Sequence, residues 1–336
     1  MTTPLIEKLN ITSSVSIVII SISLMLFGGF AMTRITKRLR LPNVTAYIVA
    51  GILMGPYCLN LIPIGLIERM DFIADIALAF IAFSTGEFFR FSTLKKSGVK
   101  VLLITFLEAC LASIAVFIAT HYVLGLDMVF SVVLAALASA TAPASTMMTI
   151  RQTHAKGDFV DTLLQVVALD DVVGLVAYSI AISIALASMT GNFQAQNVLR
   201  PIIMNLFAFA LGGVFGLILK FLLHKRSTDN RLIVSIALLF AFCGICALMG
   251  VSSLLGCMSM SMIYINTSDD ERLFKQLNYF SPPLLLLFFV RSGLNFDLGA
   301  IFSSSDHIGS ASLLAVGVVY FCLLYTSPSP RDQRGS

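Results

Sequence analysis

Apolar residues occur along this chain in long runs that short polar stretches separate. Most runs approach the roughly 20 apolar residues that a helix needs to cross a bilayer. We draw eleven such segments, and the boundary at Gly250 is the least distinct because the runs on either side almost touch. The segments are 13–33, 42–60, 73–90, 101–120, 128–150, 159–187, 201–223, 232–250, 251–265, 282–300 and 309–325. The pattern predicts an all-α polytopic membrane protein with about eleven transmembrane helices.

Composition and charge support this prediction. Apolar residues make up 57% of the 336 positions and charged residues 12%, against about 25% charged residues in soluble domains. Almost every Lys and Arg lies in a loop after an odd-numbered segment, whereas the loops after even-numbered segments hold only Arg69 and Arg200. Because basic loops stay in the cytoplasm, we expect the N-terminus outside. The net charge of +4 is therefore a topology signal and does not indicate nucleic-acid binding.

Small residues four positions apart occur in the second and seventh segments. The sequences are GILMG at 51–55 and GGVFG at 212–216. Such spacing lets two helix backbones approach closely. We expect these glycines to pack helices together rather than to bind a ligand.

The fifth segment should contain a broken helix. A proline removes one helical hydrogen bond and pushes the preceding residue away from helical angles. Backbone that is not helical at membrane depth is tolerated where it is buried in protein or lines a cavity, and its free carbonyls suit a small cation. The alternative is a plain kink that the hydroxyl groups satisfy. The residues concerned are Ser139, Ala140, Thr141, Ala142 and Pro143.

Asp170 and Asp171 are adjacent carboxylates inside the long sixth segment. If the fifth helix enters near Met128, Thr141 lies thirteen residues in, roughly 20 Å along the axis. If the sixth leaves from the opposite side near Asp158, Asp171 lies equally deep. Ionisable residues at that depth usually handle ions or protons. Asp170, Asp171 and Thr141 are the candidate cation and proton site.

Other charged residues in apolar segments are candidate partners of this site. Glu87 either pairs with Arg90 one helical turn away or takes part in transport. Glu108 either forms a structural hydrogen bond or is a second titrating site. Arg291 must pair with a carboxylate or reach an interface, so it meets Asp170 or Glu108, or lies at the external side with Asp297.

Five motifs together resemble a known family. They are LPNVTAYIVAGILMGP, TGEFF, ATAPAS, KGDFVDTLLQVVALDDVVGL and FFVRSGLNFDL, within approximately 13–321. The chain is similar to the second branch of the monovalent cation:proton antiporters, which includes bacterial sodium/proton antiporters and potassium efflux proteins. The motifs of the fifth and sixth segments are the most specific.

The resemblance implies a fold of thirteen helices with inverted repeats, two crossing broken helices, and a separate dimerisation domain. It implies that Asp171 binds the cation or proton with Asp170 beside it, and that a protein with two such carboxylates is electrogenic. A lysine and the second broken helix, expected beyond the eleventh segment, are missing. We therefore expect an incomplete antiporter domain at 1–325 and a disordered, non-native tail at 326–336.

The predicted function is exchange of Na⁺ or K⁺ for protons by alternating access, with Asp171 as the shared site. The alternatives are a gated potassium efflux pathway and a non-transporting fragment or sensor. No nucleotide-binding loop or nucleophile and base pair is present, so we expect no enzyme activity and no cofactor. The expected partners are the transported ions and the lipid bilayer of a bacterial inner membrane, in a multi-pass homodimer.

Overall fold

The computed structural model describes residues 13–39, 41–141, 146, 149–150, 153–190, 195–223, 228–268 and 270–296. All regular structure in these residues is helical, which confirms the predicted all-α fold class. The predicted eleventh segment and the predicted tail at 326–336 lie outside the described residues. The number of transmembrane helices and the inverted repeat remain predictions.

Each predicted segment up to residue 300 contains a helix. The elements are α2 (Ser14–Arg38), α3 (Asn43–Met54), α4 (Ile64–Arg69), α5 (Asp71–Gly86), α6 (Phe91–Phe117), the π-helical η1 (Ile118–Val123), α7 (Met128–Ala138), α9 (Asp158–Thr190), α10 (Ala195–Leu223), α11 (Thr228–Met249), α12 (Leu254–Ser268), α13 (Glu271–Phe280) and α14 (Pro282–Leu294). The short helices α4 and α13 were not predicted, because neither forms an apolar run of its own.

Four helices in the described part of the chain are long and apolar enough to cross a membrane. They lie within α2, α6 with η1, α10 and α11. The bent pair α13 and α14, which meet at 48°, counts as a fifth if it forms one span. The bend follows from Pro282 and Pro283, which open α14 directly after Ser281, because proline lacks the N–H group that would continue the preceding helix.

The abrupt junction between α11 and α12 depends on a glycine. Gly250 has a φ of +64°, a conformation that glycine adopts without the steric cost of a side chain. The turn ends α11 at Met249 and lets α12 start at Leu254. The least distinct boundary of the sequence pattern is therefore a true break between two helices.

The small-residue motifs pack helices together, as predicted. A side chain at Gly51 would collide with the backbone of α14 at Val290, and one at Gly212 would collide with the backbone of α12 at Gly256. The first contact joins α3 to α14, and the second joins α10 to α12. Glycine is needed at both positions because the two backbones touch.

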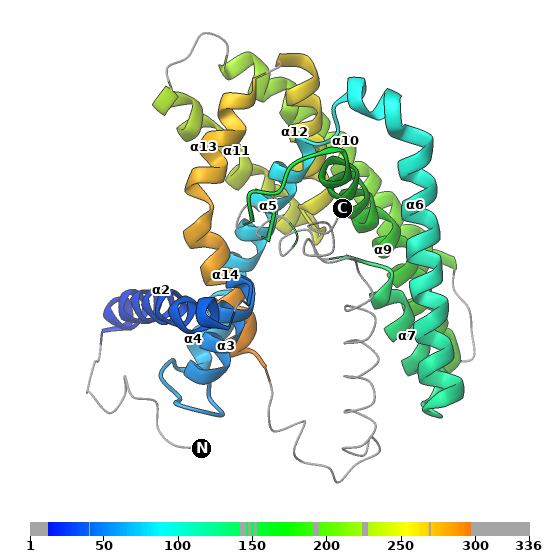
Figure 1. Cartoon of the computed structure of the whole chain (residues 1–336), viewed down its shortest axis with the longest axis horizontal. Coiled ribbons are helices and arrows are strands. Elements are labelled where there is room, and N and C mark those ends of the chain that lie inside the picture. The colour runs from blue at the N-terminus through cyan, green and yellow to red at the C-terminus, as the bar shows by residue number, and fades with distance from the viewer. Residues whose placement is uncertain are drawn as a thin grey trace.

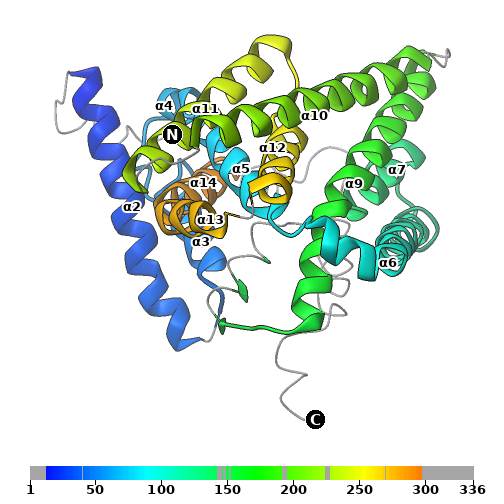
Figure 2. The same ribbon diagram turned by 90° about the horizontal axis from the view of Figure 1, so that it is seen from above.

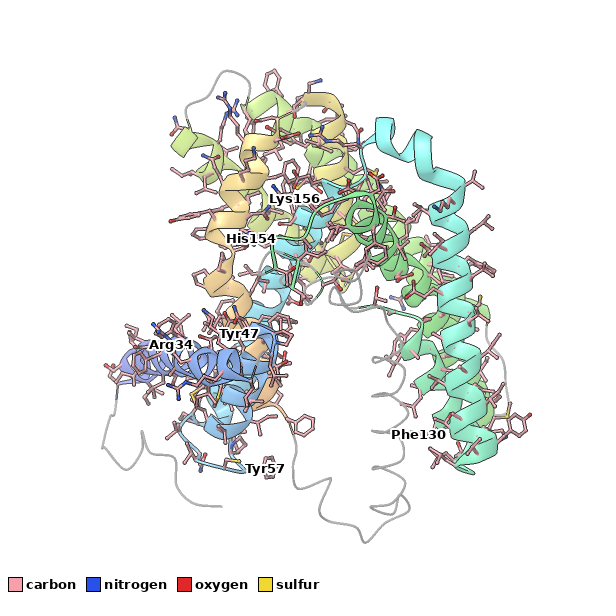
Figure 3. All side chains as sticks on the ribbon, in the orientation of Figure 1. Arg34, Tyr47, Tyr57, Phe130, His154 and Lys156 are labelled. Carbon is pink, nitrogen blue, oxygen red and sulfur yellow. The ribbon has the colours of Figure 1, made fainter. Side chains whose placement is uncertain are left out.

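The helices form a central group with a smaller group on either side (Figures 1 and 2). In the centre, α5, α10, α11, α12 and α13 share an apolar core that includes Phe80, Phe242, Tyr264 and Phe274. On one side α2 and α3 pack with α14, and on the other α6, α7 and α9 pack together. Arg34 of α2 and Phe130 of α7 mark these opposite sides in Figure 3. Contacts of α9 with α10 connect the second group to the centre.

Charged residues from three predicted cytoplasmic loops meet at one end of the central group. Arg90, after α5, forms a 2.6 Å ion pair with Glu271 at the start of α13. Arg231, near the start of α11, forms a 2.5 Å ion pair with Asp270. The joints between α5 and α6 and between α12 and α13 lie together at the top of Figure 1. Their proximity agrees with the odd-numbered loops sharing one side of the membrane.

Candidate functional site

The fifth predicted segment loses its helix where the proline predicts. α7 ends at Ala138, and neither Ala140 nor Thr141 is helical. The hydroxyl of Ser139 donates a 2.7 Å hydrogen bond to the carbonyl oxygen of Ala136, so Ser139 satisfies the helix end itself. Ala142 and Pro143 lie outside the described residues. The described part of the break leaves Thr141 on non-helical chain beside the sixth segment.

Thr141 and Asp170 meet across the interface of these two segments. The Thr141 hydroxyl donates a hydrogen bond of 2.8 Å to Oδ2 of Asp170. The side chain of Asp170 is almost completely buried, with 1% of its surface exposed. Its other oxygen, Oδ1, has no hydrogen-bond partner among the residues that the structure describes. A buried carboxylate oxygen without a donor is costly, and a bound cation or proton would remove that cost.

Asp171 follows directly on α9, within the same long helix. Its side chain lies outside what the structure describes, so its predicted role as the shared ligand is untested. Consecutive helical residues point about 100° apart. Asp170 faces the broken segment through its hydrogen bond with Thr141.

A close approach of α9 to the broken segment positions this hydrogen bond. A Cβ atom placed on Gly174 would lie only 2.6 Å from Cβ of Ala140. Gly174 stands four residues after Asp170 and therefore on the same face of α9. Ala140 directly precedes Thr141, so the absence of a side chain at Gly174 lets Thr141 come within hydrogen-bonding distance of Asp170.

Glu108 is placed differently from the prediction. The sequence predicted a buried carboxylate, but the side chain of Glu108 is exposed on α6. The helix turns its small residues, such as Ala109, toward the protein, and this leaves the neighbouring Glu108 on the outer face.

Two arginines form ion pairs with residues that the sequence did not suggest. Arg90, which follows α5, pairs with Glu271, and the role of Glu87 remains a prediction. Arg291 of α14 pairs with Asp71 in the first turn of α5, and not with Asp170 or Glu108. The sequence did not suggest Asp71, because sequence distance hides the packing of α14 against α5. The third predicted alternative, Asp297, lies outside the described residues.

Comparison with known proteins decides the family. The family model described as "Sodium/hydrogen exchanger, transmembrane" matches residues 11–327. This chain belongs to that family. The multi-pass membrane character and the prediction of a transporter rather than an enzyme are thereby confirmed. Membership of the narrower second branch remains a prediction.

Individual relatives of this exchanger-family protein come from Methanocaldococcus jannaschii. The probable Na⁺/H⁺ antiporter 3 is 22% identical over 290 residues, which are 82% of this chain and 71% of that protein. A structure of the sodium proton antiporter MjNhaP1 matches with a TM-score of 0.69 and 20% identity, covering 94% of this chain and 79% of that one. An electron-microscopy map of MjNhaP1 matches with a TM-score of 0.67 and 18% identity, covering 95% and 80%. At these identities the structural matches support the fold.

Two residues of this exchanger-family protein were missed in the sequence: Gly174, beside the candidate site, and Asp71, the partner of Arg291. Gly174 could have been found from its spacing, because it lies one helical turn beyond Asp170 in a segment already singled out. Asp71 could have been found because it is a carboxylate at the predicted external end of a helix. One of the alternatives for Arg291 also placed that residue on the external side.

Proposed function

We propose that this protein exchanges a monovalent cation for protons across the membrane, and that the carboxylates of Asp170 and Asp171 carry both ligands in turn. The observation that carries the proposal is the buried Asp170 carboxylate, bonded to Thr141 at the end of a broken helix. Membership of the sodium/hydrogen exchanger family supports it. The names of the relatives favour Na⁺ as the cation.

The chemistry of exchange follows from competition for one oxygen-rich site. Carboxylate oxygens are ligands of hard cations, and the same oxygens bind protons. Oδ1 of Asp170 has no hydrogen-bond partner among the described residues, so it can accept either ligand while Oδ2 stays bonded to Thr141. Because a proton and a cation cannot occupy the same lone pair together, occupancy by one displaces the other.

Asp171 adds a second carboxylate at the same depth on α9. The resemblance to the cation:proton antiporters assigns the principal ligand role to this residue, and we retain that assignment. With two carboxylates, more protons than cations could bind in one cycle. A membrane potential of 100 mV then contributes about 2.3 kcal/mol of driving free energy for each net charge that crosses the membrane.

Alternating access requires one part of the protein to move against another. The group formed by α6, α7 and α9 holds Thr141 and Asp170 together and contacts the central group through α9. We propose that this group rocks as a unit and exposes the site to each side in turn, as in other transporters with sites near the bilayer midplane. We further propose a homodimer in a bacterial inner membrane with the N-terminus outside.

Reconstituted vesicles test the proposal. The chain is placed in liposomes with an acidic lumen and a pH-sensitive dye, and Na⁺ or K⁺ is added outside. We expect cation-dependent proton efflux with the unchanged chain, and its loss in Asp170→Asn and Asp171→Asn. Asp161→Asn is the matched control, because Asp161 is an exposed carboxylate on the same helix.

Two results would contradict the proposal. Normal exchange in both aspartate variants would exclude the carboxylates as the shared site. A continuous ion current that exceeds the turnover rate of any transporter would indicate a gated pathway instead of exchange. Folding of each variant is followed by size-exclusion chromatography, so that loss of exchange is separated from loss of the protein.

A further inference from the structure

An open groove of about 610 Å³ lies between α11, α13 and the start of α14. Its lining is mainly apolar, with one lysine at its edge. The residues are Leu232, Lys275, Gln276, Tyr279, Phe280, Pro283 and Leu284. The groove lies on a different helix group from Thr141 and Asp170, so it is separate from the candidate exchange site.

The amphipathic helix α13 forms one wall of this groove. Leu273, Phe274 and Leu277 on one face are buried in the central core. On the other face Lys275 and Tyr279 are one helical turn apart and exposed, and 91% of the Tyr279 surface is accessible. Because the apolar face is used in the core, the face with Lys275 and Tyr279 is the one that α13 presents to the groove and to the surroundings.

The polarity of the lining changes along the groove in one direction. Lys275 comes first, near the end of the molecule where the predicted cytoplasmic loops meet, and Arg272, which does not line the groove, lies about one helical turn before it. Tyr279 follows, and Pro283 and Leu284 continue along α14 toward the bilayer. A phospholipid has the same order of parts: a charged headgroup, an interfacial region and hydrocarbon tails. Tyrosine prefers the headgroup level of a bilayer, which fits its place in the middle.

The charge at the edge of the groove selects an anionic headgroup. The neighbouring carboxylates already face other arginines, since Asp270 pairs with Arg231 and Glu271 with Arg90. Neither Arg272 nor Lys275 has an ion pair among the residues that the structure describes. The local excess of positive charge attracts anionic lipids, by an amount that grows with each basic residue near the surface.

We propose that the groove binds an anionic phospholipid, with the phosphate headgroup at Lys275 and one acyl chain against Tyr279, Pro283 and Leu284. The lipid would bridge α11 to the α13 and α14 pair on the cytoplasmic side. The assignment does not depend on which ion the protein exchanges, because it uses other residues.

Tryptophan fluorescence provides a direct test, because the chain contains no tryptophan. Tyr279→Trp places a single reporter in the groove. The variant is reconstituted in vesicles of unlabelled phosphatidylcholine. Brominated phosphatidylglycerol is added in increasing fractions in one series, and brominated phosphatidylcholine in the other. We expect the phosphatidylglycerol to quench the reporter at a several-fold lower fraction than the phosphatidylcholine.

Charge variants in the same background locate the effect. Lys275→Gln should lower the preference for phosphatidylglycerol by about fivefold. Lys220→Gln removes an exposed lysine of α10 that does not line the groove and should leave the preference unchanged. Leu248→Trp, on a residue that is 90% exposed near the far end of α11, reports the bulk lipid for comparison.

Three outcomes would overturn the proposal. Equal quenching of Tyr279→Trp by both lipids would mean that the groove holds bulk lipid without selection. Quenching by neither lipid, with a dimer that buries the reporter, would assign the groove to a second copy of the chain. A preference that survives Lys275→Gln but falls in Lys220→Gln would place the anionic site elsewhere.

Discussion

Gly174→Ala should disrupt ion exchange while leaving the overall fold intact. The added Cβ would lie 2.6 Å from Cβ and 3.3 Å from Cα of Ala140, whereas carbon atoms in good contact are about 3.5–4.0 Å apart. Ala140 must therefore move by roughly 1 Å. Overpacking of this kind costs about 1–3 kcal/mol, which a multi-helix protein tolerates.

The displacement of Ala140 reaches the site through the next residue. Thr141 donates a 2.8 Å hydrogen bond to Asp170, and a shift of about 1 Å exceeds the range of a good hydrogen bond. Hydrogen bonds to charged groups contribute about 1.5–3 kcal/mol. We therefore expect Gly174→Ala to change the apparent cation affinity, or the exchange rate, by about tenfold or more.

A vesicle exchange assay with two companion variants makes this prediction specific. Gly244→Ala, in α11, is the matched control because nothing lies within 4 Å of its added Cβ, and it should exchange normally. Combining Gly174→Ala with Ala140→Gly removes the closest contact and should restore part of the activity. Wild-type exchange by Gly174→Ala alone would refute the argument that this close approach positions Thr141.

Three further predictions concern hydrogen bonding, charge and helix packing. Thr141→Val should weaken apparent cation affinity by about tenfold or more in titrations of exchange against cation concentration, whereas Thr141→Ser keeps the hydroxyl and should stay near wild type. Asp270→Ala removes the carboxylate that pairs with the mostly buried Arg231 and accepts from Tyr264, so it should lower the free energy of unfolding in detergent by about 3–5 kcal/mol. Glu271→Ala breaks a more exposed ion pair and should cost about 1 kcal/mol or less. Gly212→Ala should destabilise the protein because its Cβ meets the backbone of α12, while Gly213→Ala has ordinary contacts starting at 3.4 Å and should be tolerated in the same unfolding measurement.

The elements that the sequence predicted best are those that depend on local chemistry. Apolar runs predicted the helices because a segment in lipid must satisfy its own backbone N–H and C=O groups with internal hydrogen bonds. Pro143 predicted the end of α7 for a similarly local reason. The sequence also placed Thr141 at the depth of the aspartate pair, but that depth was worked out for Asp171, and the contact of Asp170 with Thr141 was not predicted.

The elements that the sequence predicted poorly depend on how distant helices pack. Arg291 has several carboxylates within reach by depth alone, and only the contact between α14 and α5 selects Asp71. Glu108 was expected inside because its neighbours are apolar, but in a membrane protein the outer face is apolar as well. Hydrophobic neighbours therefore do not distinguish a buried position from one that faces lipid.

The two largely buried aspartates of the described chain differ in how completely they are bonded. Asp270 accepts hydrogen bonds from Arg231, from Tyr264 and from the backbone N–H of Arg272. Its charge is balanced and both oxygens are used, which is what a structural carboxylate needs. Asp170 accepts from Thr141 alone, and its second oxygen has no partner among the described residues.

In the proposed exchange cycle, this difference separates a structural charge from the exchange site. A fully bonded carboxylate gains little from a cation or a proton, since either ligand must first displace a donor. A buried carboxylate with one oxygen left open is stabilised by whichever ligand arrives, and it releases that ligand without breaking the protein's own hydrogen bonds. Thr141 thus serves the proposed cycle by orienting Asp170 through one oxygen while leaving the other for the transported ion.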